Sequence, residues 1–221
     1  MDLYDVMRTT FACRDFTDED VPDDVLARIF DNARFAPSGG NRQGNFVIVV
    51  RDQAMKDMLG EAARPAGKLY TAQNKAGESP WNTIHATKVT PEVEAATEVP
   101  LHLTEPAKKA PVLLVFCVDL QVVASTDKNL DRVGVISGGS IYPFVWNVLL
   151  AARNEGYGGT ITTLAVAQEP KLQQALNIPP HVAVAAIVPL GKPRKQLTKL
   201  RRRPVGDIVR LERFDGAPFK G

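Results

Sequence analysis

An unbroken apolar run covers residues 111–118 and limits the folds that are open to this chain. It contains β-branched residues and no alternating polar ones, a pattern typical of a strand buried on both faces. A second run of this kind covers residues 182–190, and residues 46–50 predict a shorter buried strand. Because a strand buried on both faces needs cover on each side, these runs predict a central sheet between layers of helices.

Two amphipathic helices are expected to provide that cover. Residues 21–36 begin with a proline and two acids, which suit the first turn and the positive end of a helix, and continue with apolar residues at helical spacing. This helix should end at Pro37, because proline biases the residue before it out of the helical region. Residues 140–155 predict a longer helix that stops at Gly156. Helices and strands interleave along residues 1–221, so we expect a single α+β domain built as a three-layer sandwich.

One long segment breaks this order. Proline and glycine interrupt residues 61–109 repeatedly, and no helical or strand period persists there. A stretch of this length without a period is typical of a functional lid or a mobile insertion. We expect residues 61–109 to form an irregular insertion over a binding site, with Tyr70 or Trp81 as its aromatic contact.

The charge pattern argues against nucleic acid and membrane as partners. The chain has 27 basic and 25 acidic residues, a net charge of +2, although seven of the basic residues cluster in residues 192–203. No segment reaches the roughly 20 apolar residues of a membrane helix, and no apolar signal core follows Met1. We therefore expect a cytoplasmic protein. Its two cysteines, Cys13 and Cys117, predict free thiols, with Cys117 buried.

No familiar catalytic constellation is present. The chain lacks a dinucleotide-binding glycine motif after a strand, a phosphate-binding Walker loop and a zinc-protease helix motif. The three histidines, His85, His102 and His181, are scattered, and we interpret them as surface or loop residues without a metal or a catalytic role.

Three segments instead offer groups that could hold an anionic, flat ligand. Arg8, Thr10 and Arg14 supply guanidinium and hydroxyl groups, although arginines near helix ends are also common as solvated caps. Residues 37–43 form a loop with serine, glycine, asparagine and glutamine, which suits close approach to a heteroaromatic ring or an ordinary turn. Residues 156–163 place several glycines after a helix, where a plain helix stop would need one.

Taken together, these segments resemble the nitroreductase family. Residues 8–16 are similar to its amino-terminal R-S-x-R-x-F signature, and residues 36–43, which read APSGGNRQ, are similar to its A-P-S-x-x-N-x-Q loop. Residues 140–152 resemble its central helix, and residues 201–205 resemble its carboxy-terminal K/R-x-R-x-P element. The four occur in the family's order along the whole chain.

The resemblance implies a mixed, mainly antiparallel sheet, an intertwined homodimer and one FMN in each of two interface sites. It also implies ping-pong transfer of electrons from NADH or NADPH to a small electron-poor acceptor such as a nitroaromatic or a quinone, with the hydride chemistry supplied by the flavin. No catalytic side chain is then needed. The residues that it implies for FMN binding are Arg8, Thr10, Arg14, Pro37, Ser38, Gly39, Asn41, Gln43, Gly159, Thr160, Arg201 and Arg202.

Two readings stay open within this resemblance. The same fold could serve as a flavin-dependent dehydrogenase or dehalogenase, or as an FMN-binding protein without turnover. The carboxy-terminal arm, residues 205–221, is too apolar for a free tail. We expect it to wrap over the second subunit.

Overall fold

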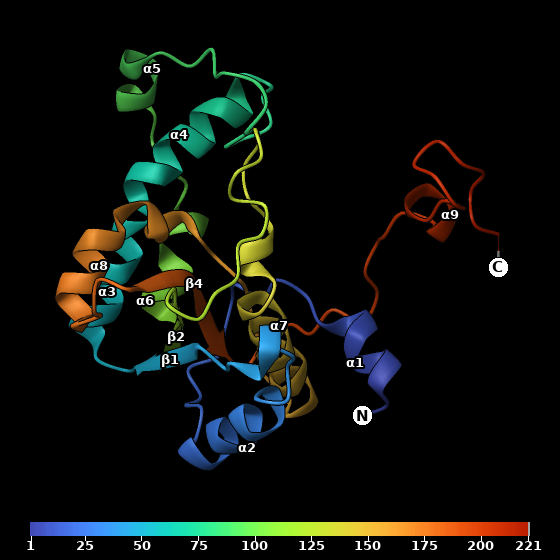
Figure 1. Ribbon diagram of the computed structural model, residues 1–221. Helices are drawn as coiled ribbons and strands as arrows, with labels where there is room; N and C mark the ends of the chain where they lie inside the picture. The colour runs from blue at the N-terminus through green and yellow to red at the C-terminus, as the bar shows by residue number, and fades with distance from the viewer. Residues whose placement is uncertain (221) are drawn as a thin grey trace.

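A four-stranded sheet organises the computed structural model, which describes residues 1–220 (Figure 1). The strand order is β1-β2-β4-β3, and each neighbouring pair is antiparallel. An isolated bridge between Ala12 and Gly159 adds a parallel contact beside β3. The predicted mixed, mainly antiparallel sheet is confirmed. The strands are β1 (Asn45–Val50), β2 (Val112–Asp119), β3 (Gly158–Gly159) and β4 (Val182–Gly191).

Strand β2 lies in the middle of the core, and its side chains alternate between two clusters. Leu114 and Phe116 pack on one face of the sheet, whereas Leu113 and Val115 pack on the other. All four side chains are fully buried. This two-sided burial explains the unbroken apolar run, and it confirms the expectation of three layers.

The first helical layer consists of α2 (Asp23–Ala33) and α7 (Ile141–Asn154). Helix α2 presents Val25, Leu26 and Ile29 to the sheet, as its helical spacing predicts. Helix α7 ends just before Gly156, whose φ of +85° lies in the left-handed region that favours glycine. The second layer contains α3 (Gln53–Ala62), α6 (Glu105–Lys109), the 3₁₀ helix η4 (Leu164–Gln168) and α8 (Glu169–Leu176).

Much of the segment 61–109 is helical, so the expectation of an irregular insertion is wrong for that part. Helix α4 starts at a turn that accommodates Pro65, since proline fits the first positions of a helix. Gly67 is a close-packing position, where an added Cβ would lie 3.0 Å from Val99 Cγ1. Helices α4 and α5 project from the body (Figure 1). The segment contains α4 (Arg64–Lys75), α5 (Pro91–Ala96), the 3₁₀ helix η2 (Leu101–Leu103) and α6.

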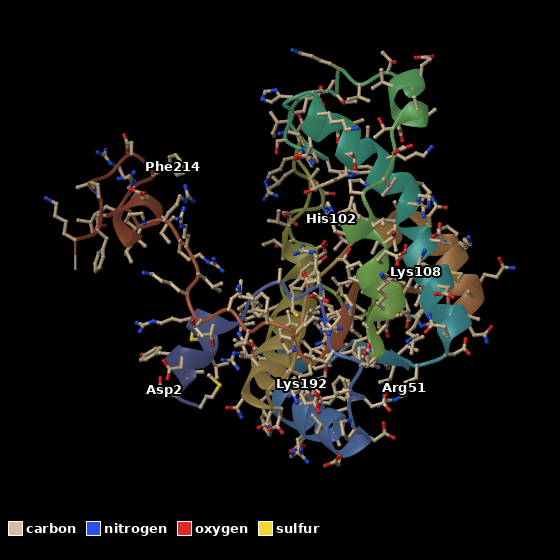
Figure 2. The ribbon with its side chains drawn as sticks, turned by 180° about the vertical axis from the view of Figure 1, so that it is seen from behind. Asp2, Arg51, His102, Lys108, Lys192 and Phe214 are labelled. Atoms are coloured by element: carbon tan, nitrogen blue, oxygen red, sulfur yellow. The ribbon has the colours of Figure 1, made fainter. Side chains whose placement is uncertain are left out.

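The carboxy-terminal arm extends away from the body and carries the short helix α9 (Val205–Ile208) (Figures 1 and 2). Its Phe214 side chain is 100% exposed. The amino-terminal helix α1 (Leu3–Thr9) also exposes apolar side chains, Leu3 and Met7 among them. The last residue of the arm, Gly221, lies outside the described residues.

Candidate functional site

A cavity of about 190 Å³ lies between the segment after β3, the middle of α4 and the stretch from η2 into α6. One wall is polar and comes from consecutive residues after Gly159. The segment 61–109 adds apolar side chains together with Tyr70 and His102. The lining residues are Arg14, Tyr70, His102, Leu103, Pro106, Ala107, Thr160, Ile161, Thr162, Thr163, Leu164 and Pro189.

Arg14 is the cationic residue of this cavity that sequence reasoning singled out. Its guanidinium makes one long hydrogen bond, from Nη1 to the carbonyl oxygen of Ala12 at 3.4 Å. It forms no ion pair within residues 1–220, whereas the neighbouring Asp15 lies 3.4 Å from Arg194. Arg14 therefore keeps donors available for a carbonyl, ring nitrogen or phosphate oxygen of a ligand.

The glycines of β3 serve close packing within the protein. A Cβ added to Gly159 would lie 2.7 Å from the carbonyl oxygen of Pro189, and one added to Gly158 would lie 3.2 Å from Cβ of Cys13. The carbonyl oxygen of Gly159 accepts a hydrogen bond from the N–H of Cys13 at 3.0 Å, which fixes the segment that carries Arg14. The role of Gly159 at a flavin stays a prediction.

The segment after β3 forms the polar wall. Thr160 is 5% exposed and lines the cavity, followed by Ile161, Thr162 and Thr163. Thr162 is anchored to β4 by paired backbone hydrogen bonds with Ile187, of 3.0 and 2.9 Å. These contacts hold the wall rigidly against the sheet, so its backbone and hydroxyl groups are positioned before any ligand arrives.

The 37–43 loop is tightly hydrogen-bonded and contains the 3₁₀ helix η1 (Gly39–Asn41). The N–H of Gln43 donates to Ser38 Oγ at 3.0 Å, and its side-chain Nε2 donates to Asn41 Oδ1 at 3.2 Å. Asn41 and Gln43 have φ angles of +54° and +50°, in the left-handed region. Two such non-glycine residues so close together are a form of backbone strain that clusters at binding sites.

The structure of the single chain does not bring the predicted site residues together. Arg14 and Thr160 line the cavity, whereas the 37–43 loop lies beside the start of α7, where Gly39 N–H donates to Ser140 Oγ at 3.1 Å. Arg201 and Arg202 lie on the exposed stretch that leads to the arm. No residue of the 37–43 loop and neither of these arginines lines the cavity.

The two remaining predicted residues belong to α1 and its end. Arg8 is exposed, and its guanidinium carbon lies 5.9 Å from the centre of the Tyr4 ring. The hydroxyl of Thr10 is buried and donates to the carbonyl oxygen of Val6 at 2.7 Å. Thr10 therefore caps the helix with the hydroxyl group that was expected to contact FMN.

The segment 61–109 contributes two polar side chains to the cavity, Tyr70 and His102. Figure 2 labels His102 near the base of this projecting part. Sequence reasoning had Tyr70 as a candidate but missed His102, because nothing in its neighbourhood distinguishes it from an ordinary loop histidine. Trp81 does not line the cavity: it is 50% exposed, and its backbone N–H donates to Gln73 Oε1 at 3.0 Å.

Both cysteines are free and Cys117 is buried, as predicted, and the structure shows that Cys13 is buried as well. Burial raises the pKa of Cys117 to about 11 and also raises the pKa of Cys13. Both thiols are therefore protonated at neutral pH and inert as nucleophiles. Within residues 1–220, no group of three or more His, Cys, Asp or Glu is arranged to hold a metal ion, and no helix is long and apolar enough to cross a membrane.

Comparison with known proteins gives the family. The sequence profile of the nitroreductase family matches residues 7–192, and the chain belongs to that family. An iodotyrosine deiodinase of Hydra vulgaris is 24% identical over 210 residues, which covers 94% of this chain and 72% of the relative.

Solved structures agree with this assignment at the level of the fold. An oxidised iodotyrosine deiodinase bound to FMN and 3-iodo-L-tyrosine gives a TM-score of 0.69 at 22% identity, covering 96% of this chain and 100% of that one. Nitroreductase A from Vibrio parahaemolyticus gives 0.68 at 19% identity, covering 97% and 78%. The predicted nitroreductase-like fold is confirmed.

Proposed function

We propose that this chain is an FMN-dependent oxidoreductase that takes electrons from NADH or NADPH and passes them to a small electron-poor acceptor, such as a nitroaromatic or a quinone. The observation that carries the proposal is the cavity in which Arg14, without a carboxylate partner in residues 1–220, faces the rigid polar wall at Thr160. Family membership adds the redox chemistry to this geometry.

The donors in this cavity fit FMN. The guanidinium of Arg14 suits a carbonyl oxygen and ring nitrogen of the isoalloxazine or an oxygen of the phosphate, and the hydroxyl of Thr160 suits a second polar edge. Tyr70 offers a ring for stacking, while Leu103 and Leu164 exclude water from the reacting face. When bound, the flavin accepts a hydride and returns electrons to the acceptor.

The size of the cavity supports a site shared between two copies. At about 190 Å³ it is smaller than the roughly 300–1,000 Å³ of typical cofactor pockets. Further groups with flavin-binding chemistry, at Asn41, Gln43 and Arg202, lie outside it. In an intertwined homodimer, the 37–43 loop and the basic stretch of the partner would complete the pocket, with the carboxy-terminal arm packed on the other subunit.

The experiment that tests this function starts from the purified protein. We expect a visible spectrum of oxidised flavin and release of FMN on denaturation, because the site has donors for one phosphate and no dinucleotide motif. Under argon, NADH or NADPH should bleach the flavin, and a nitroaromatic or quinone should restore its colour. Release of FAD, or failure to bind any flavin after reconstitution, would refute the proposal.

A dehalogenase is the second candidate, since the Hydra vulgaris relative aligned over most of this chain is an iodotyrosine deiodinase. Adding 3-iodo-L-tyrosine to the reduced protein distinguishes the two. Iodide release with reoxidation of the flavin would favour dehalogenation, whereas reoxidation by the nitroaromatic alone favours the first candidate. A protein that binds FMN would be a flavin-binding protein without this activity if neither NADH nor NADPH bleaches the flavin and if, after reduction with dithionite, neither acceptor reoxidises it.

A further inference from the structure

A buried carboxylate, Asp127, lies in the loop between β2 and α7 and has no part in the chemistry proposed above. Its side chain is 5% exposed. Its Oδ2 accepts hydrogen bonds from Arg132 Nη1 at 2.8 Å and from the N–H groups of Val135 and Ile136 at 2.8 and 3.4 Å. Its Oδ1 is buried and has no hydrogen-bond partner within residues 1–220. Burying a carboxylate in this way costs folding free energy, so its presence calls for a reason.

The donors keep this carboxylate ionised. The backbone N–H of Val135, followed by the guanidinium of Arg132, lowers the pKa of Asp127 below its ordinary value of 3.8. At neutral pH, Asp127 is therefore a fixed negative charge that draws two consecutive backbone N–H groups and one arginine onto a single oxygen. The 127–136 turn closes around it.

The turn leads directly into the 3₁₀ helix η3 (Ile136–Gly138). The other side of η3 rests on Tyr142, because a Cβ added to Gly138 would lie 2.8 Å from the Tyr142 ring. The Tyr142 hydroxyl donates to the carbonyl oxygen of Ala185 on β4 at 3.2 Å. Helix η3 is therefore held between the Asp127 carboxylate at its start and a ring anchored to the sheet.

Ser140 connects this assembly to the 37–43 loop. It follows η3 by two residues, and its Oγ accepts the hydrogen bond from Gly39 N–H at 3.1 Å. Within the loop, Ser38 Oγ accepts from the N–H of Gln43, whose φ is +50°. A continuous series of contacts thus runs from Asp127 through η3 and Ser140 to the loop.

We infer that Asp127 is a positioning residue that fixes the conformation of the 37–43 loop through η3 and Ser140. The loop holds Asn41 and Gln43 in strained left-handed conformations, and such strain persists only where the surroundings determine it. Asp127 lies outside the loop and holds η3 in place, and η3 in turn places Ser140 against Gly39. The positioning role of Asp127 does not depend on the proposed function. Only the identity of the ligand that the loop binds, FMN, rests on it.

Hydrogen exchange of the 37–45 peptide in the full-length protein tests this directly. Asp127→Ala should speed exchange of the amides in the 37–45 peptide roughly tenfold, because the hydrogen bonds of Gly39 and Gln43 open more often. Asp127→Asn keeps an acceptor for the backbone but loses the charge, so we expect an intermediate effect. Asp52→Ala is the matched control: it removes another aspartate that accepts a backbone N–H, from Met55 at 2.8 Å at the start of α3. It should leave the 37–45 peptide unchanged.

A double-mutant cycle separates positioning from general destabilisation. Ser140→Ala should also speed exchange of the peptide, and Asp127→Ala with Ser140→Ala should add little to either single variant, because both interrupt one series of contacts. Unchanged exchange in Asp127→Ala, or effects of the two substitutions that multiply independently, would overturn the inference.

Titration of the same variants with FMN keeps this inference distinct from the proposed function. Faster exchange with weaker FMN binding supports both. Faster exchange with unaltered FMN binding supports the role of Asp127 and counts against the 37–43 loop as part of the flavin site.

Discussion

Two phenylalanines show how differently the sheet and the carboxy-terminal arm are built. Phe116 on β2 is fully buried and meets the Phe144 ring edge-on at 5.8 Å, whereas Phe214 on the arm is 100% exposed. The sheet has helices of its own chain on both faces. The arm bonds mainly to itself, as in the bridge between Arg210 and Pro218. The body therefore buries a core within its own chain, whereas apolar side chains of the arm stay exposed, and we propose that a second copy of the chain covers them.

The largest effect on stability is expected in the sheet. Phe116→Ala should reduce the free energy of unfolding by about 3–5 kcal/mol, because it removes a fully buried ring and leaves a cavity. Phe214→Ala is the matched control and should change the unfolding of the body by less than about 0.5 kcal/mol. Denaturant titration at a concentration that keeps the protein monomeric measures both. Equal losses would contradict the distinction between the two regions.

Removal of the arm should separate assembly from folding. A chain truncated after Pro204 should retain the circular dichroism of the body, since the core residues all precede that point. It should lose the dimer and with it the bound FMN, because the shared pocket is no longer completed. Size-exclusion chromatography with a flavin assay gives the result. A truncated chain that stays dimeric would show that the arm is not the connection between subunits.

Single arginines should affect the flavin more than the fold. Arg14→Ala and Arg202→Ala should each weaken FMN binding by about 1.5–3 kcal/mol, roughly tenfold or more, through loss of a charge-assisted contact. Both variants should remain dimeric. Arg14→Lys serves as a control that keeps the charge but loses the planar donor pair, so we expect a smaller loss. Fluorescence titration with FMN measures the affinities, and unchanged values for Arg14→Ala would remove it from the site.

The loop should follow with a smaller loss. Asn41→Ala with Gln43→Ala removes hydrogen-bonding groups expected at the flavin ring, each worth about 0.5–1.5 kcal/mol. Flavin retention should fall or flavin reduction should slow, while the unfolding midpoint stays close to that of the parent. Stopped-flow reduction and thermal melts check the two parts. Unaltered flavin content and reduction would return the 37–43 loop to an ordinary turn.

The smallest effect concerns pH and the base of the projecting part. The pKa of Glu61 falls from 4.5 to about 2, chiefly through its hydrogen bond from Arg64 and then that from Lys108. A lowered folded-state pKa means that this contribution is complete above about pH 4.5 and is lost as the pH falls towards 2. The three side chains are partly exposed, so we expect a contribution of less than about 1 kcal/mol to the free energy of unfolding.

Glu61→Gln isolates that contribution. The melting temperature of this variant should lie slightly below that of the parent at neutral pH. The difference in melting temperature should disappear as the pH falls from 4.5 to 2. A gap that persists at the acidic end would assign the effect to packing and not to charge.

The strands were predictable because a strand buried on both faces has a continuous run of apolar residues in its own sequence. Residues 111–118, which contain most of β2, are such a run. Helix α4 was not predictable, since the role of Gly67 depends on Val99. Three of the prolines that seemed to break the segment, Pro65, Pro91 and Pro106, lie in the first turns of helices. The same limit applies to the cavity. Arg14 and Thr160 carried a local signal, whereas His102 joins them only through the tertiary fold.

Sedimentation of the full-length protein, followed both in the protein band and in the visible flavin band, tests whether two copies share each flavin site. We expect the two signals to sediment together as a dimer with one FMN per chain, because the proposed site takes groups from both copies. A monomer that holds FMN tightly would contradict the shared site. A dimer that takes up no flavin after reconstitution would contradict the proposed oxidoreductase.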